Sequence, residues 1–278
     1  MQETSEKYSS FWTISNKFRK DTEPFFRNLD QVFACRGEYI SSDPVSRMIR
    51  VKYHGQGYFI KTYTKGGKRL RRFIGRNRAR AEWENLRFFS RLGIPTPELV
   101  AWGQDIHFGL FQRGAVITKE IKDSTDLATL AREGDECIYD NAWMDHVGFL
   151  YSKYARLLHD NGFVHTDFKW RNILVTKGEK PEVYLIDCPS GRKMVNPFFI
   201  HWRIKDLACL DKIARYHLSP ATRLKFYKHY TGRARLSPKD KRVIKKIIRF
   251  YKLIPERKIV NTDKSWQYRP HEKSKGHI

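Results

Sequence analysis

Cysteine and long apolar runs are both scarce in this chain of 278 residues. Its four cysteines form no C-x-x-C pair and lie at no zinc-site spacing from a histidine, which argues against a structural metal and for a reducing compartment. No apolar run approaches the ~20 residues of a membrane-spanning helix. The N-terminus also lacks the hydrophobic segment of a signal peptide. These absences predict a cytoplasmic protein.

Acidic residues are the minority charge, with 30 Asp and Glu against 54 Lys and Arg and a formal net charge of +24. Such an excess predicts an anionic partner, which can be nucleic acid, acidic lipid headgroups or a phosphorylated substrate. The basic residues gather at 65–80 and 239–249, although a merely solvated surface is the alternative interpretation. No aromatic-interleaved recognition motif supports nucleic acid, so we expect no nucleic-acid partner.

The most informative motif is H-x-D-x-x-x-x-N, which runs from His165 to Asn172 and is followed by a strand-like run that ends at Asp187. Phosphoryl transfer from ATP needs a carboxylate near the acceptor hydroxyl and separate oxygen ligands for the metal that bridges the phosphates. In the kinase order, Asp167 is the expected base, and Asn172 and Asp187 are the expected magnesium ligands. Lys169 is close enough in sequence to reach the γ-phosphate. The competing interpretation is a turn aspartate with an unrelated asparagine behind it.

The N-terminal half supplies a candidate nucleotide-binding lysine. Two β-rich runs, 45–53 and 58–63, flank a Gly-x-Gly turn and predict a hairpin. Lys61 lies in the second run, in a sequence similar to the V-A-I-K strand whose lysine binds the α and β phosphates. A helix is predicted at 78–92, where Glu82 is the preferred partner of Lys61 and Glu84 is the alternative.

Further elements follow from apolar periodicity and capping signals. A strand pair is predicted at Gly109–Glu120, with Ala115–Glu120 as an edge strand that leads into a hinge. Adenine would bind backbone groups near Lys119 to Ile121. Asp126 is a possible helix cap. Helices are predicted at 143–160, 202–208, 221–230 and 238–253, and the last of these is basic and amphipathic.

Taken together, these motifs resemble the bacterial lipopolysaccharide kinase family (Kdo/WaaP, InaA-like) of the protein-kinase-like superfamily over about residues 37–230. The matching segments are Tyr58–Lys61, Ala81–Glu84, Gly93–Pro97, Leu158–Asp167, Asn172–Leu174, Leu185–Asp187 and Trp202–Ala208. The resemblance implies an α+β, bilobal fold with a β-rich N-lobe that carries one main helix and a mostly helical C-lobe. The expected divisions are an N-terminal helical extension (1–36), the N-lobe (37–121), the C-lobe (122–260) and a basic, disordered tail (261–278).

The resemblance also implies ATP and Mg²⁺ as cofactors and transfer to a hydroxyl of an inner-core heptose or Kdo of lipopolysaccharide. The partners would then be a core glycolipid acceptor and the anionic inner-membrane surface, which the two basic clusters would contact from the cytoplasmic side. No G-x-G-x-x-G precedes Lys61. The turn at Tyr39–Asp43 takes its place, with Ser41 and Ser42 covering the phosphates through backbone amides.

Other departures from the protein-kinase pattern narrow the range of possible acceptors. His165-Thr166-Asp167 lacks the arginine that senses a phosphorylated activation loop, no A-P-E follows, and Cys188-Pro189 replaces Phe-Gly. A small or glycan hydroxyl therefore fits better than a peptide. A protein or small-molecule kinase, a non-catalytic nucleotide-binding scaffold and a nucleic-acid-binding protein remain as alternatives. His159 and His165 are interpreted as structural residues that fix the loop backbone through hydrogen bonds, and Asp206 as a buried carboxylate that accepts from that backbone.

Overall fold

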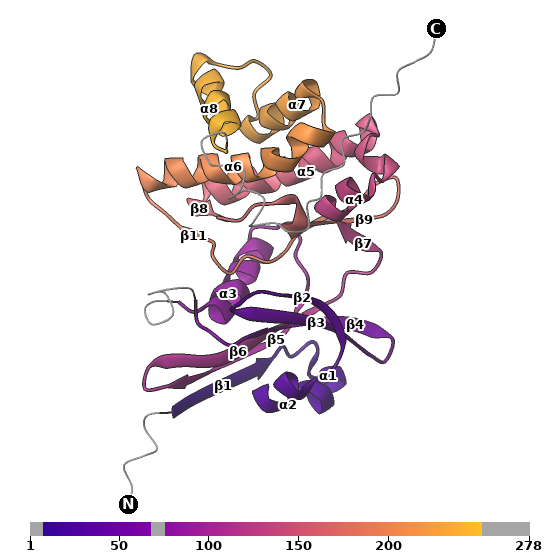
Figure 1. Ribbon diagram of the computed structural model, residues 1–278, viewed down its shortest axis with the longest axis vertical. Helices are drawn as coiled ribbons and strands as arrows, with labels where there is room; N and C mark the ends of the chain where they lie inside the picture. The colour runs from indigo at the N-terminus through magenta and orange to yellow at the C-terminus, as the bar shows by residue number, and fades with distance from the viewer. Residues whose placement is uncertain (1–7, 68–75, 252–278) are drawn as a thin grey trace, which may run out of the picture.

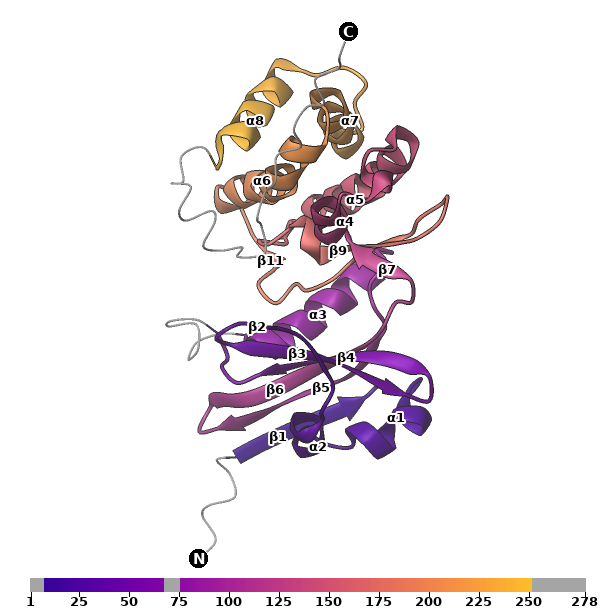
Figure 2. The same cartoon turned by 45° about the vertical axis from the view of Figure 1, so that its right-hand side comes forward.

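Two lobes stack end to end in the computed structural model, which describes residues 8–67 and 76–251 (Figure 1). The N-lobe is a six-stranded antiparallel sheet in the order β1-β5-β6-β4-β3-β2. Its strands are β1 (Tyr8–Ile14), β2 (Glu38–Ser42), β3 (Ser46–Tyr53), β4 (Gln56–Tyr63), β5 (Leu99–His107) and β6 (Leu110–Lys119), and its helices are α1 (Arg19–Phe26), α2 (Leu29–Ala34) and α3 (Arg78–Arg91). In both ribbon views α1 and α2 lie on one side of this sheet and α3 on the side that faces the C-lobe (Figures 1 and 2).

The predicted hairpin is confirmed as β3 and β4, with Met48 opposite Lys61. His54 and Gly55 both have positive φ angles, 49° and 75°. Two successive residues of this kind allow the tight turn whose twist matches the twist of paired strands. The hairpin fixes the register that holds Lys61 at the cleft.

Helix α3 also forms where it was predicted. Asn77 caps it, accepting a hydrogen bond from the amide of Arg80, and Gly93, at φ 73°, follows its C-terminal end. Its apolar stripe, which includes Leu86 and Phe89, is buried in the core that joins α3 to the C-lobe. The helix therefore lies between the lobes, where its first turns border the cleft.

Two predictions for the N-lobe were wrong. Residues 8–14 of the expected helical extension form an edge strand, because β1 pairs with β5 along its whole length; only the following segment is helical. Gly109–Glu120 contains one long strand, β6, and its end lies between β4 and β5 in the middle of the sheet. Each error involves a strand partner that is distant in sequence, β5 for β1 and β4 for β6, which local patterns do not reveal.

The C-lobe is mostly helical, as predicted. It contains α4 (Leu127–Glu133), α5 (Asn141–Asp160), α6 (Phe198–His217), α7 (Pro220–Thr231), α8 (Pro238–Arg249), the 3₁₀ helices η2 (Glu136–Ile138) and η3 (Trp170–Asn172), and the short strands β7 (Ser124–Asp126), β8 (Phe163–Val164), β9 (Ile173–Thr176), β10 (Val183–Leu185) and β11 (Arg192–Lys193). Asp126 caps α4 by accepting from the amide of Thr129 at 2.9 Å. Within the two described stretches, no helix is both long and apolar enough to cross a bilayer.

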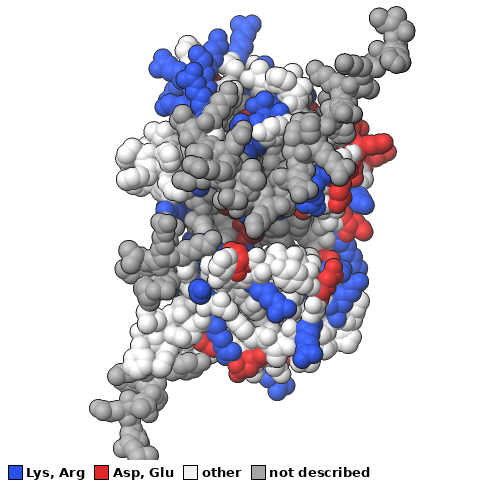
Figure 3. Space-filling view, viewed as in Figure 1, with Lys and Arg blue, Asp and Glu red and all other residues white. Residues whose placement is uncertain are grey.

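Most apolar residues of α8 face inward, although Ile248 is 38% exposed. Ile247 is buried, and Val243, Ile244 and Tyr251 pack against the same C-lobe core. The basic residues of α8 are exposed, whereas Asp240 is buried, and blue side chains gather over α8 at the top of the space-filling view (Figure 3). The tail predicted at 261–278 lies outside the described residues.

Candidate active site

A cleft of about 980 Å³ separates the two lobes. It is lined by β2 to β4 and α3 on the N-lobe side and by the loops around β8 to β10 on the C-lobe side. Every residue that the sequence marked as a site candidate lines this cleft: Ser41, Ser42, Lys61, Glu82, Lys119, Ile121, Asp167, Lys169, Asn172 and Asp187. The structure thus brings together groups from segments more than a hundred residues apart.

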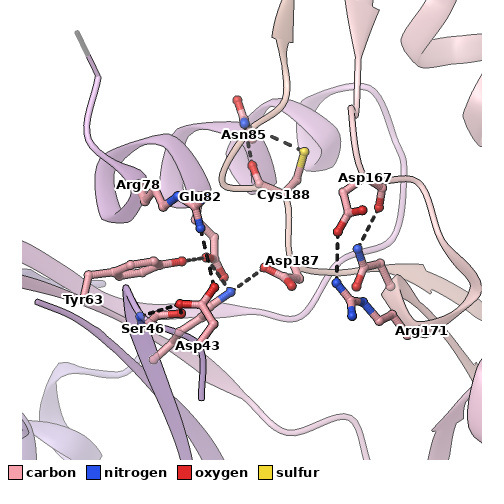
Figure 4. Close-up of polar contacts among 12 residues, drawn as sticks. Asp43, Ser46, Tyr63, Arg78, Glu82, Asn85, Asp167, Arg171, Asp187 and Cys188 are labelled. Carbon is pink, nitrogen blue, oxygen red and sulfur yellow. Dashed lines mark hydrogen bonds and ion pairs between the residues drawn. The ribbon is translucent and has the colours of Figure 1, made fainter. Parts of the chain in front are cut away.

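Lys61 lies against two carboxylates on the N-lobe side of the cleft, and Figure 4 shows Tyr63, Glu82 and Asp187 directed toward one another. The Lys61 ammonium group lies 3.0 Å from Glu82 and also binds Asp187, and the hydroxyl of Tyr63 donates to Glu82. Burial acts to lower the pKa of Lys61, but the charges of Asp187 and Glu82 outweigh it and hold that pKa well above its ordinary value. Lys61 is therefore a permanent cation. Glu84, the alternative partner, instead binds Arg76 and Arg80 on the outer side of α3.

Asp187 lies two residues after strand β10 and is in the left-handed region, at φ 55°. The loop that follows it is tied to α3. The side-chain amide of Asn85 donates to the carbonyl groups of Cys188 at 2.6 Å and Gly191 at 2.9 Å, and Arg76 donates to the same Gly191 carbonyl at 2.9 Å. The Asp187 carboxylate is consequently fixed relative to both lobes.

Asn172 and Asp187 have the chemistry expected of magnesium ligands. The side-chain NH₂ of Asn172 donates to the carbonyl of Asp167 at 2.8 Å, so the opposite end of that amide, its oxygen, is the one available to a ligand. Mg²⁺ prefers oxygen ligands and is usually held by one or two carboxylates together with substrate phosphates. Among the described residues, no group of three or more His, Cys, Asp or Glu side chains could hold a metal alone. The donor set fits an ion that arrives with a nucleotide.

Two cations hold the carboxylate of Asp167. Lys169 lies 2.9 Å from one of its oxygens and Arg171 lies 3.2 Å from the other. Burial acts to raise the pKa of Asp167, but Lys169 and then Arg171 outweigh it, and the resulting pKa is below the ordinary value. Asp167 is therefore ionised at neutral pH. Each of its oxygens lies in an ion pair that a substrate group can exchange.

The backbone before Asp167 is fixed by Asp206, as predicted. This fully buried carboxylate accepts from the amides of His165 at 2.7 Å and Thr166 at 2.8 Å. Lys205 donates to the carbonyl of Thr166 at 2.8 Å. Thr166 has a φ of 68°, which an isolated non-glycine residue seldom adopts. Asp206 and Lys205 thus stabilise the loop conformation that directs Asp167 into the cleft.

The two histidines are structural, but one works differently from the prediction. His159 lies 2.9 Å from the hydroxyl of Tyr230 and 3.4 Å from Asp206, so it supports the loop indirectly. Neither ring nitrogen of His165 has a hydrogen-bond partner in the described part of the chain, and its ring stacks on Phe168 at 5.0 Å. Burial lowers the pKa of His165, so the ring is neutral and acts by packing.

The turn expected to cover the phosphates lies slightly later than predicted. Ser41 and Ser42 end strand β2, and the chain reverses at Asp43, whose carboxylate accepts from the amides of Val45 at 2.7 Å and Ser46 at 2.8 Å. This leaves both serines at the cleft but directs those two later amides towards Asp43. Phosphate binding by the serine amides stays a prediction.

The hinge has few backbone donors left for an adenine. The amide of Lys119 donates to the carbonyl of Glu98, and that of Glu120 to the carbonyl of Gly57, both at 2.9 Å. No residue of the described stretches accepts from the amide of Ile121. Of the predicted segment, Ile121 is therefore the residue best placed to donate to a base.

Sequence reasoning missed Arg171, Tyr63, Asn85 and Arg76. The spacing between Asp167 and Arg171 matches an i, i+4 ion pair and could have suggested that contact. Arg76 belongs to the basic run 65–80, where charge alone favoured a solvated or lipid-facing role. The described members Arg76, Arg78 and Arg80 instead pair with Glu84 or Asp43; residues 68–75 are outside the described part.

Comparison with known proteins agrees with this geometry. Residues 36–230 match the lipopolysaccharide kinase (Kdo/WaaP) family, which is well over half of the chain. The chain belongs to this family. It is thus a phosphotransferase of the lipopolysaccharide sugar kinase type, and a protein-kinase or scaffold interpretation is not favoured.

Two named enzymes and one solved structure are similar to this chain. A 3-deoxy-D-manno-octulosonic acid kinase of Haemophilus influenzae (strain 86-028NP) is 26% identical over 223 residues, which is 71% of this chain and 88% of the relative. An enzyme of the same name from Actinobacillus succinogenes is 29% identical over 149 residues, or 53% of this chain and 56% of the relative. A solved structure titled "WaaP in complex with acyl carrier protein" has a TM-score of 0.59 and 20% identity and covers 92% of this chain and 94% of its own. That structural likeness supports the predicted bilobal fold.

Proposed function

We propose that this kinase transfers the γ-phosphate of ATP to a hydroxyl of a Kdo sugar in lipopolysaccharide or its precursor. The observation that supports it most is the meeting of Lys61, Asp167 and Asp187 in one cleft between the lobes. A cation for the phosphates, a carboxylate for the hydroxyl and a metal-binding carboxylate are the groups that phosphoryl transfer requires. The similarity to named Kdo kinases favours Kdo over heptose.

In this proposal the N-lobe binds the nucleotide. Lys61, held by Glu82, contacts the α and β phosphates, and the turn after Ser41 and Ser42 lies above them. The base lies against the hinge and accepts from the amide of Ile121. Asn172 and Asp187 would hold Mg²⁺, which would neutralise charge on the phosphate oxygens. Because Asp187 contacts Lys61, binding of the nucleotide with its metal would separate that ion pair.

The chemical step uses few protein groups. The sugar hydroxyl oxygen forms a bond to the γ-phosphorus while the bond between that phosphorus and the bridging oxygen of ADP breaks, and the hydroxyl proton passes to Asp167. A weak base is sufficient, because the transition state is loose and the proton leaves late. Lys169 and Arg171 keep Asp167 ionised. As substrates bind, Lys169 can turn from Asp167 to the transferring phosphoryl group.

The acceptor side of the cleft is cationic. Lys169, Arg171 and Lys205 all line the cleft around Asp167. Kdo is a sugar acid, so its carboxylate would be attracted to this side, whereas a neutral heptose lacks that group. Arginine and lysine are the side chains that bind carboxylates most strongly. The same charges would disfavour a cationic antibiotic as acceptor.

The test is incubation with labelled ATP, Mg²⁺ and separate acceptors: a Kdo-bearing lipid A precursor, a heptose-bearing core and a mixture of proteins. Asp167→Ala is the inactive control, and mass spectrometry locates the added phosphate. We expect phosphate on Kdo. Phosphate on heptose alone would correct the sugar, and no incorporation above the control for any acceptor would refute the proposed function.

A further inference from the structure

The N-terminal end of α6 has an unusual surface for a water-soluble face. Three apolar side chains in and before its first turn are strongly exposed: Val195 by 78%, Phe198 by 68% and Ile200 by 44%. In the view of Figure 1 this end of α6 lies at the left of the C-lobe, where the space-filling view shows an uncharged projection (Figure 3). A cluster of this kind at one projecting end is the usual mark of an interaction site, since scattered single apolar residues are the normal case.

Basic residues border this projection on two sides. Arg192 and Lys193 of β11 are exposed and precede it in the chain. On the other side lies α8, because the rings of His201 in α6 and Phe250 just after α8 are 5.8 Å apart. The exposed Lys246 and Arg249 of the last turn of α8 are therefore close to the same end. In the space-filling view, the basic surface over α8 lies above the uncharged projection (Figure 3).

The backbone adds a positive partial charge to this surface. Helix α6 is 20 residues long, has no side-chain cap at Pro197 and carries no acidic residue in its first turn. The first amides of a helix lack intrahelical partners and favour anions. An apolar projection surrounded by positive charge matches the boundary of an anionic bilayer, where acyl chains meet phosphate headgroups.

The projection also lies close to the site of chemistry. Trp202 and Lys205, in the next turns of α6, line the cleft, and Lys205 contacts the loop that carries Asp167. Seven residues of helix from Phe198 to Lys205 span about 10 Å. A sugar held on a membrane-embedded lipid could therefore reach the cleft from a bilayer that contacts Phe198.

We propose that Val195, Phe198 and Ile200 insert into the interface of an anionic phospholipid membrane, with Lys193 and the basic face of α8 on its headgroups. This inference rests on the proposed lipid-linked acceptor and specifies how the enzyme reaches it. The membrane contact is thereby assigned to the end of α6 beside the cleft. Arg76, Arg78 and Arg80 of the basic run 65–80 pair with Glu84 or Asp43 of the protein itself, so the proposal does not require them.

The test compares two exposed phenylalanines. Phe198→Ser removes the proposed insertion, and Phe108→Ser is the matched control, because Phe108 is 59% exposed on a turn of the N-lobe. Full-length proteins are floated with vesicles of phosphatidylcholine alone or mixed with phosphatidylglycerol. We expect wild type and Phe108→Ser to bind the mixed vesicles only, and Phe198→Ser to bind them about tenfold more weakly. Lys246→Glu should weaken binding about fivefold, with less effect in high salt.

Kinase assays separate this inference from the proposed function. Phe198→Ser should lose activity on a vesicle-embedded acceptor and keep it on the same sugar released from its lipid. Equal losses in Phe198→Ser and Phe108→Ser, or no vesicle binding by the wild type, would overturn the inference. So would a wild-type dimer that Phe198→Ser converts to a monomer, because a second copy would then cover the surface. If no acceptor is phosphorylated, the proposed function fails while vesicle binding still decides the membrane contact.

Discussion

The two walls of the cleft hold their key charges in opposite ways. On the N-lobe wall, the side chains of Lys61 and Glu82 are 11% and 7% exposed. The hydroxyl of Tyr63 donates a hydrogen bond to Glu82. On the C-lobe wall, the Asp167 and Arg171 side chains are 36% and 42% exposed. Burial thus gives Lys61, the proposed nucleotide-binding lysine, one position. Asp167, the proposed proton acceptor, pairs with the exposed Arg171 and with Lys169, whose side chain is 16% exposed, and substrate would displace these cations. The side of the cleft proposed to bind the nucleotide is therefore the more rigid. On the side proposed to bind the acceptor, the ion pairs can exchange.

The largest expected effect is on the C-lobe wall. Asp167→Ala removes the group that orients the hydroxyl and takes its proton, and we expect the rate of transfer to fall about 1,000-fold. Asp160→Ala is the matched control, because Asp160 is another exposed aspartate paired with an arginine at i−4. Initial rates at saturating ATP measure the effect. A loss of less than tenfold in Asp167→Ala would show that this carboxylate is not the base.

On the N-lobe wall, Lys61→Ala leaves Glu82 and Asp187 in the cleft without their shared cation. We expect kcat/KM for ATP to fall about 100-fold, as when one preorganised donor is removed from a transition-state site. Lys52→Ala, on the exposed side of the same hairpin, should change it less than twofold. ATP titrations of both variants check this, and equal effects would contradict the special role of the buried lysine.

Asp206 supports the loop beneath the C-lobe wall, and its removal should lower the stability of the protein. Asp206→Ala leaves two loop amides buried without an acceptor, and we expect the free energy of unfolding to fall by about 2 kcal/mol. Asp145→Ala removes a half-buried carboxylate near the surface that pairs with Lys225 and His229, and its cost should stay below about 1 kcal/mol. Urea unfolding midpoints distinguish the two. No difference between them would mean that the loop does not depend on Asp206.

The smallest expected effect is a shift of the pH–rate profile on removal of Arg171, one of the two cations paired with Asp167. Arg171 helps to lower the pKa of Asp167, and activity requires its ionised form, so activity is lost as pH falls through that pKa. Arg171→Ala should raise the pKa and move the acidic limb of the pH–rate profile to higher pH. Arg156→Ala, which breaks the exposed pair with Asp160, should leave that limb in place. An unshifted limb in Arg171→Ala would argue against this electrostatic role.

The sequence predicted the cleft residues better than the fold around them. Lys61, Asp167, Asn172 and Asp187 belong to a motif order in which each residue type has a chemical reason, and Glu82 follows from helical spacing. Strand β1 was missed because its bulky residues fit a helix equally well, and only pairing with distant β5 reveals a strand. Local patterns contain no information about such partners.

The partners of charged side chains are also hard to predict from the sequence. Arg76 lies within a basic run, and sequence alone favoured a surface role for the whole run. The structure shows it binding Glu84 and the carbonyl of Gly191, 115 residues away. Long side chains reach partners that composition cannot identify. The amphipathic pattern of α8 likewise predicted its two faces correctly but did not show that the apolar face packs on the C-lobe core.

The most direct test of the account is a crystal structure with a non-hydrolysable ATP analogue and Mn²⁺, using the anomalous signal to locate the metal. The account predicts a Mn²⁺ peak within coordination distance, about 2.1–2.3 Å, of the Asn172 oxygen and the Asp187 carboxylate, with the γ-phosphate facing Asp167. A peak elsewhere, or a nucleotide whose γ-phosphate faces away from Asp167, would contradict it.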